Sequence, residues 1–318
     1  MRGGAQSAAR VARARLLVSQ DAEADAAGGL LRESFVRRLE RLSLLTRGLV
    51  SEGVAGEHRS RRHASSPEVS DFRRYVPGDD YRRIDWNAYA RLDGIFLKLT
   101  EAKVEVPVHL LLDCSPSMNW GTPNKLAYAR RLAAAIGYLA LAQLDAVSGA
   151  GFAGELYPRF PTVRGKNQAT RLLTYLDAAP IGQDSKIERS MAEYAESAPH
   201  AGIAFLISDL LSVDSWQAGV QHLLRHGIDV VVIQIVSPQE RHPTLEGEIE
   251  LIDAETGAVV ELVVGDEARR TYEARTEAWC EEVEAFCLRS EVGHLLLDTT
   301  VELEEIFLNR MRQRRIVR

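Results

Sequence analysis

Side chains that offer oxygen ligands follow two apolar runs of the chain. The first run, Val108–Leu112, ends in Asp113, which is followed by Ser115 and Ser117 in the order Asp-x-Ser-x-Ser. Alternating residues of an extended loop point the same way, so these three side chains can converge on one point. Carboxylate and hydroxyl oxygens are hard ligands that suit Mg²⁺, or another divalent cation such as Mn²⁺ or Ca²⁺. The pattern therefore indicates a divalent-metal site.

A second apolar run, Ile203–Ser208, also ends in a carboxylate, Asp209. In an open parallel sheet, ligands gather at the carboxyl ends of the strands, so Asp113 and Asp209 can meet although they lie far apart in the sequence. The alternative is that the Asp-x-Ser-x-Ser segment only forms a capping loop before the helix that starts at Lys125. The second strand-end aspartate favours the metal site, and we expect all four side chains in one coordination sphere.

The elements that must hold these residues alternate between apolar strands and helices. Continuous apolar strands separated by helices are typical of a parallel sheet covered on both faces. A hairpin over 248–253 and 259–264 is predicted before the last units. We therefore expect an α/β fold with a doubly wound, mostly parallel sheet of the Rossmann type. The other predicted strands are 145–152, 155–158, 230–236 and 294–298, and the predicted helices are 125–144, 168–176, 187–196, 214–225, 266–288 and 301–312.

The chain before this sheet divides into two further parts. Residues 1–30 are predicted to be a disordered leader, because Met1–Ala27 is rich in Ala and Arg and is interrupted by acidic residues. Residues 31–105 are predicted to hold a helix, whose apolar positions step by three or four from Leu31, followed by an irregular arm. Residues 106–318 are expected to form the α/β domain, with the hairpin near 248–264 as an insertion.

The segment Arg73–Arg91 is the most distinctive part of this arm, because charges of both signs and aromatic residues lie close together in it. Aromatic rings can pack beside guanidinium groups. One interpretation is a clamp of ion pairs that fastens the arm to the α/β domain. The other is a surface that binds a partner protein or a phosphate. The residues concerned are Arg73, Tyr75, Asp79, Asp80, Arg83, Asp85, Trp86 and Arg91.

This arm, its lead-in Glu57-His-Arg-Ser60 and the later Asp113-x-Ser-x-Ser segment resemble the bacterial domain-of-unknown-function family 58. The resemblance runs from Phe35 to Val236. It implies a von Willebrand factor A-like core and a role as an adaptor for a MoxR-type AAA+ ATPase. It implies no established chemistry.

The metal-ligand pattern itself is similar to the metal-ion-dependent adhesion site (MIDAS) of von Willebrand factor A domains. In that site the two serines and a threonine on a second loop contact the metal, and two aspartates act directly or through water. The resemblance assigns the threonine's place to Ser185, in the segment Gly182–Ile187. Thr170 and Thr174 are alternatives for the same place.

Composition excludes several classes of protein. A formal net charge of −6 argues against a dedicated nucleic-acid binder, since phosphate backbones are bound by concentrated positive charge. The longest clean apolar run, Leu132–Ala142, falls short of the about 20 residues that a membrane span needs. The three cysteines, Cys114, Cys280 and Cys287, show neither a disulfide nor a zinc spacing. We therefore expect a soluble, cytoplasmic protein.

These patterns favour a non-enzymatic, metal-dependent module that binds a protein partner. An acidic residue of the partner would complete the coordination of the metal. The alternative is a Mg²⁺-dependent phosphohydrolase that uses Asp113 and Asp209, and it would need an acid-base residue within reach of the metal. The sequence holds neither a P-loop nor a Gly-x-Ser-x-Gly nucleophile segment.

Overall fold

The computed structural model describes residues 30–31, 33–39, 64–75, 89, 95–104, 107–182, 184–198, 201–212, 214–252 and 258–311. The chain forms two compact units. Met1–Gly53 and Pro107–Arg318 belong to the larger one, which holds the α/β domain, and Val54–Val106 forms the smaller one.

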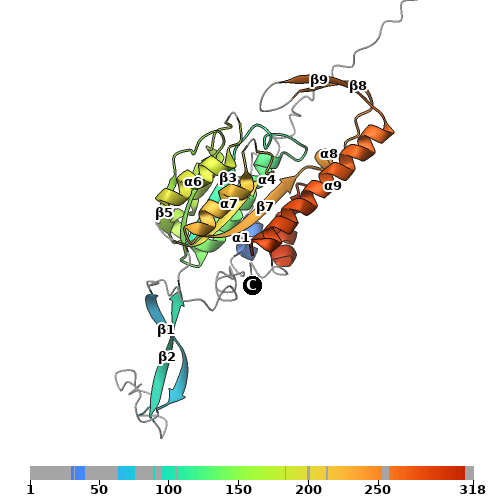
Figure 1. Cartoon of the computed structure of the whole chain (residues 1–318). Coiled ribbons are helices and arrows are strands. Elements are labelled where there is room, and N and C mark those ends of the chain that lie inside the picture. The colour runs from blue at the N-terminus through green and yellow to red at the C-terminus, as the bar shows by residue number, and fades with distance from the viewer. Residues whose placement is uncertain are drawn as a thin grey trace, which may run out of the picture. The chain divides into compact units, whose positions relative to one another are not determined.

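A six-stranded sheet forms the centre of the larger unit, in the order β10-β7-β6-β3-β4-β5 (Figure 1). Neighbouring strands from β10 to β4 are parallel, and only β5 runs antiparallel, at the edge beside β4. All residues of β3 and β6 are buried, as expected of parallel strands that are covered on both faces. The predicted mostly parallel α/β fold is therefore confirmed. The strands are β3 (Val108–Asp113), β4 (Ala146–Phe152), β5 (Phe160–Arg164), β6 (Ile203–Ser208), β7 (Asp229–Val236) and β10 (Gly293–Asp298).

Helices cover both faces of this sheet. Leu111 of β3 packs in one hydrophobic cluster with residues of α6, α7 and α9. The preceding residue, Leu110, points to the opposite face, where α4 and α5 approach so closely that a Cβ at Gly137 would lie 2.4 Å from Leu172 Cδ2. The helices of this unit are α1 (Glu33–Leu39), α4 (Lys125–Ala142), α5 (Ala169–Asp177), α6 (Ile187–Ser197), α7 (Trp216–Arg225), α8 (Pro238–Arg241), α9 (Asp266–Arg289) and α10 (Leu303–Glu305), with a 3₁₀ turn at Lys166–Gln168 and a π-helical turn at Ile306–Arg310.

The first helix, α1, packs on the α/β domain. The ring of Phe35 meets that of Phe307 edge-on with centroids 6.0 Å apart, and Arg38 forms an ion pair with Glu304. The sequence interpretation grouped this helix with the arm in 31–105. The structure corrects that grouping, because the apolar face of α1 is buried against the end of the α/β domain.

Two further predictions on the larger unit differ from the structure. The strand expected at 155–158 is only an isolated bridge between Phe152 and Leu156, and the strand that follows β4 is β5. Pro161 lies in β5, where the lack of a donor is tolerated because this strand is at the sheet edge. The expected helix 301–312 is divided between α10 and the π-helical turn, and residue 312 lies outside the described residues. The hairpin is present as β8 (Gly247–Ile252) and β9 (Val259–Val264).

The smaller unit contains a two-stranded antiparallel sheet, β1 (Ala64–Arg74) and β2 (Phe96–Val104). The sequence interpretation expected an irregular arm after the helix in 31–105, so the strand that starts at Ala64 corrects it. Pro67 hides this strand in the sequence, and it falls at a register shift between Ser65 and Glu68, where a missing donor is tolerated.

Most of the arm residues singled out in the sequence lie outside the described part of the chain. Arg73 of β1 pairs through its backbone with Leu97 of β2, and Tyr75 N donates to Ile95 O at 2.8 Å. The others, for which the choice between clamp and docking surface stays a prediction, are Asp79, Asp80, Arg83, Asp85, Trp86 and Arg91.

Candidate metal centre

Adjacent strands bring the two predicted aspartates to the same edge of the sheet. β3 and β6 are parallel neighbours, with Leu112 opposite Ile207, so both chains leave the sheet side by side. Asp113 is the last residue of β3, and Asp209 follows the last residue of β6. Both side chains are buried, with 0% and 1% of their surface exposed.

Asp113 is surrounded by hydrogen-bond donors. Its Oδ1 accepts from the backbone N–H of Ser115 at 2.9 Å, and its Oδ2 accepts from the hydroxyls of Ser208 at 2.5 Å and Ser185 at 3.3 Å. Burial, and next the negative charge of Asp209, nevertheless raise the pKa of Asp113 to about 7. The donors do not compensate for the loss of water, so this carboxylate gains from a bound cation.

The two serines of the Asp-x-Ser-x-Ser segment present their hydroxyls together. Ser115 Oγ and Ser117 Oγ are 3.0 Å apart. Ligands 2.1 Å from an octahedral Mg²⁺ are about 3.0 Å from their neighbours along an octahedral edge, so the spacing of the two hydroxyls suits adjacent positions. A turn holds them in place, since Met118 N donates to Ser115 O at 3.1 Å.

Cys114 lies between these residues in the sequence but does not join them. Its Sγ donates to Leu112 O at 3.6 Å, and its side chain is fully buried. Burial, and next the charge of Asp113, raise the pKa of the Cys114 thiol to about 12. The sulfur therefore stays protonated at neutral pH and is a poor metal ligand.

Ser185 is brought to Asp113 by the loop that precedes α6. The loop is anchored to neighbouring segments, since Gly182 N donates to Cys114 O at 2.9 Å and Lys186 N donates to Ala153 O at 3.2 Å. Ser212 Oγ also donates to Ser185 O at 3.0 Å. The alternatives Thr170 and Thr174 both lie on α5 with exposed side chains, and the Thr174 hydroxyl donates to Thr170 O at 3.0 Å.

Sequence reasoning missed Ser208, although it directly precedes Asp209. Its hydroxyl donates to Asp113 and accepts from Leu210 N at 2.8 Å. It therefore links the two strand ends. The sequence does hold a signal for this role, because Ser208 is the polar last residue of an otherwise apolar strand, β6, which lies beside β3.

Sequence reasoning also missed the residue that pairs with Asp209. Lys125, the first residue of α4, is fully buried, and its Nζ donates to Asp209 Oδ2 at 2.8 Å and to Glu240. Burial lowers the pKa of Lys125, but the charges of Asp209 and Glu240 outweigh this effect and leave that pKa above its usual value. Lys125 is thus a permanent cation beside the predicted metal site.

The structure therefore joins four of the five predicted ligands by hydrogen bonds, namely Asp113, Ser115, Ser117 and Ser185, and binds the fifth, Asp209, to a lysine. The Asp113 carboxylate, which has only neutral hydrogen-bond donors beside it, and the serine hydroxyl oxygens fit a hard divalent cation such as Mg²⁺. Within the described residues, no three side chains of His, Cys, Asp or Glu form a metal cluster, so a softer metal finds no nitrogen and sulfur set.

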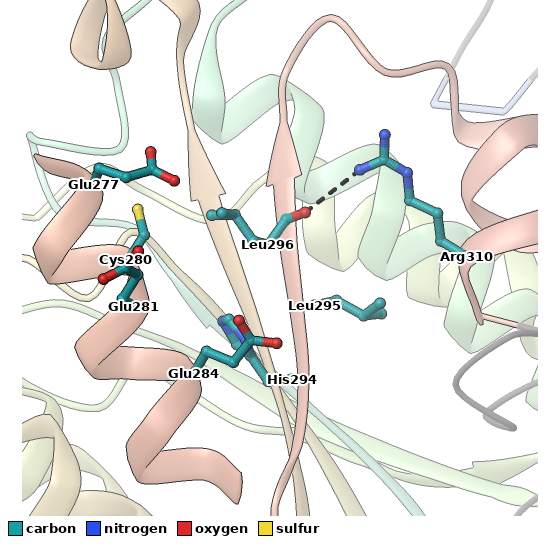
Figure 2. Close-up of a pocket in the computed structure, with 8 residues that line it drawn as sticks. All are labelled: Glu277, Cys280, Glu281, Glu284, His294, Leu295, Leu296 and Arg310. Atoms are coloured by element: carbon teal, nitrogen blue, oxygen red, sulfur yellow. Dashed lines mark hydrogen bonds between the residues drawn. The ribbon is translucent and has the colours of Figure 1, made fainter. Parts of the chain in front are cut away.

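A cavity of about 340 Å³ lies elsewhere in the domain, beside the middle of β10, and Figure 2 shows the residues that line it. Arg310 Nη1 donates to Leu296 O at 3.5 Å across one end of it. Burial raises the pKa of the Cys280 thiol, which is therefore not an activated nucleophile. The lining residues are Glu277, Cys280, Glu281, Glu284, His294, Leu295, Leu296 and Arg310.

Residues 71–281 match the family described as "Protein of unknown function DUF58". The chain belongs to this family. Its six-stranded, mostly parallel sheet is the α/β core that the sequence predicted. The uncharacterized proteins Rv1480 of Mycobacterium tuberculosis and Mb1516 of Mycobacterium bovis are each 28% identical to this chain over 246 residues, which is 76% of this chain and 77% of theirs.

Solved structures with a similar arrangement are more distant. A conserved hypothetical protein BatB from Bacteroides thetaiotaomicron is 16% identical, with a TM-score of 0.40 over 65% of this chain and 99% of that one. An aerotolerance-related membrane protein from Bacteroides fragilis is 18% identical, with a TM-score of 0.39 over 61% of this chain and 92% of that one. In the described part of this chain, no helix has the length and apolar character to cross a membrane.

Proposed function

We propose that this protein is a non-enzymatic module that binds a partner protein through a divalent cation. The observation that carries the proposal is the pair of hydroxyls, Ser115 Oγ and Ser117 Oγ, which lie 3.0 Å apart beside a buried carboxylate with a raised pKa. A cation held by Asp113 and serine hydroxyls keeps exchangeable positions. A carboxylate from outside can occupy one of them with the strength of a charge-assisted contact.

The surface beside the loop of Ser185 suits the approach of an acidic side chain. A cavity of about 550 Å³ opens there, and its charged lining residues are Lys186, Arg189, Glu155 and Asp184. Lys186 pairs with Asp184 at 3.1 Å, so the local charge is balanced until a partner arrives. The two basic and two acidic groups cancel in formal charge, so a bound cation would be the feature that favours an acidic residue of the partner.

By the family resemblance, the partner that we propose is a MoxR-type AAA+ ATPase, for which this protein would act as an adaptor. Such a partner places the complex in the cytoplasm, where ATP is available. Mg²⁺ is the proposed cation, with Mn²⁺ or Ca²⁺ as substitutes, since all three take oxygen ligands.

Catalysis is the alternative, and it requires a positioned base and acid within reach of the cation. The histidine of β3, His109, is fully buried and bonded to Tyr194 Oη at 2.8 Å, inside the core. Lys125 is charged, so it is not a base at neutral pH. These features support a binding role over a phosphohydrolase that uses Asp113 and Asp209.

The test is capture of a purified MoxR-type ATPase from the same genome by the immobilised full chain, in Mg²⁺ and in chelator. We expect capture in Mg²⁺ only, and we expect Asp113→Asn and Ser117→Ala to abolish it. Asp177→Asn, the same change on the exposed end of α5, should capture as the wild type does. Equal capture in chelator would refute metal-mediated binding, and Mg²⁺-dependent hydrolysis of p-nitrophenyl phosphate that Asp113→Asn abolishes would establish the enzyme instead.

A further inference from the structure

The two aspartates of the centre differ in what holds their oxygens. Asp113 Oδ2 accepts from two neutral hydroxyls, those of Ser208 and Ser185. Asp209 Oδ1 accepts from Leu211 N at 3.0 Å, and its Oδ2 accepts from the ammonium group of Lys125 at 2.8 Å. Hydroxyls can rotate and turn a lone pair toward a cation, whereas an ammonium group has only donors.

A divalent cation on Asp209 Oδ2 would therefore lie next to a positive charge. The cation and the Lys125 ammonium group would both be bound to the same carboxylate oxygen, and two positive charges that close together repel strongly in a buried environment. Lys125 cannot move away into water, because its side chain is fully buried and its other partner is Glu240. The cation consequently has favourable access to Asp113 and poor access to Asp209.

We propose that Lys125 keeps Asp209 out of the metal's coordination sphere, so that Asp113 and the serine hydroxyls bind the ion. This inference rests on the proposed metal-binding function and assigns its ligands. Lys125 is a positioning residue in this arrangement, and Asp209 is its counter-charge. This ligand assignment differs from the expectation in the sequence analysis, in which both aspartates coordinate the metal directly or through water.

Glu240 is the second partner of Lys125, and its negative charge keeps the net charge of the centre suited to a divalent cation. One of its oxygens accepts from Lys125, and the other accepts from Ser237 N at 2.8 Å, which closes the capping box of α8. With Asp113 ionised, the three carboxylates and one ammonium carry a formal net charge of −2, which a single divalent cation neutralises. The lysine therefore changes which carboxylate binds the ion but leaves the total charge suited to it.

The test is a charge-matched double variant, Lys125→Met/Asp209→Asn, which leaves the net charge of the centre unchanged. Mn²⁺ binding to the full chain is measured by titration calorimetry, and thermal unfolding in chelator reports on the fold. We expect the double variant to bind Mn²⁺ within about threefold of the wild type. Asp113→Asn should lose at least about 100-fold, because loss of even an outer-shell partner of a ligand costs about 10–100-fold in affinity. A folded double variant that loses Mn²⁺ as Asp113→Asn does would overturn the inference.

The single variant Lys125→Met is a second test, and its Mn²⁺ titration is read together with thermal unfolding in Mn²⁺, which reports whether the variant is folded. It frees Asp209 and makes the centre more negative, so we expect Mn²⁺ to bind at least about tenfold more tightly. Binding no tighter than that of the wild type would show that Lys125 does not restrain Asp209. A wild type that binds Mn²⁺ but captures no partner would refute the proposed function alone, and a wild type that binds no Mn²⁺ would refute both.

Discussion

The affinity of this protein for Mg²⁺ or Mn²⁺ should fall as the pH is lowered through neutrality. A carboxylate must lose its proton to act as a metal ligand. An exposed aspartate has done so by about pH 5, since its usual pKa is about 3.9. Asp113 differs, because burial and the neighbouring charge of Asp209 raise its pKa to about 7.

The magnitude follows from this pKa. With a pKa of about 7, the ionised fraction of Asp113 is roughly one tenth at pH 6 and roughly nine tenths at pH 8. The dissociation constant for the metal should therefore be about tenfold higher at pH 6 than at pH 8. Because metal binding favours the ionised form, it should also release about half a proton per ion at pH 7.

Titration calorimetry in two buffers of different ionisation enthalpy measures both quantities on the same sample. Binding at each pH gives the dissociation constant, and the dependence of the heat on the buffer gives the number of protons released. A dissociation constant that changes less than about twofold between pH 6 and pH 8, with no proton release, would refute the reasoning. It would mean that Asp113 is already ionised in the empty centre.

Further predictions concern stability and the arm. In chelator at pH 8, Asp113→Asn should raise the Tm above that of the wild type, and the difference should shrink toward pH 6. The folded wild type binds this proton more tightly than the unfolded chain, so its stability falls as the pH rises from about 4 to about 7; a pH-independent difference in thermal unfolding would contradict this. Asn124→Ala removes the side-chain acceptor of Ala127 N, 3.0 Å away, and should lower the free energy of unfolding in urea by about 1 kcal/mol. Limited trypsin digestion should remove Met1–Ala27 before it cuts inside Arg73–Arg91, because aromatic side chains there favour burial; rapid cutting inside the latter segment would refute a packed arm.

Most helices and strands of the α/β domain could be predicted from the sequence, because the apolar pattern of each segment matches the faces that it buries in the fold. The run Val108–Asp113 is apolar throughout, and a strand covered on both faces must be. The helix predicted at 187–196 is found as Ile187–Ser197. The helix predicted at 214–225 is found as Trp216–Arg225, and Ser215 caps it by accepting from Ala218 N at 3.1 Å. Local signals suffice where the apolar pattern of a segment matches the faces that it buries.

The strands that sequence reasoning missed have weaker local signals. β1 contains Pro67 and several polar residues, and it is a strand because β2 pairs with it. β5 is short and mostly exposed, so its sequence has no alternation that requires burial. In both cases the partner strand, rather than the segment's own pattern, decides the structure.

The electrostatic arrangement of the centre could not be predicted for a related reason. Lys125 lies at the start of a helix, where a lysine is ordinarily solvated, and 84 residues separate it from Asp209 in the chain. Burying its charge is unfavourable unless partners compensate, and removing one partner of a buried pair typically costs about 3–5 kcal/mol. Two carboxylates compensate here, one from the end of β6 and one from α8, and only the folded sheet brings them to the same ammonium. The aspartates alone therefore predict where the centre lies, while the lysine decides which of them remains available to a cation.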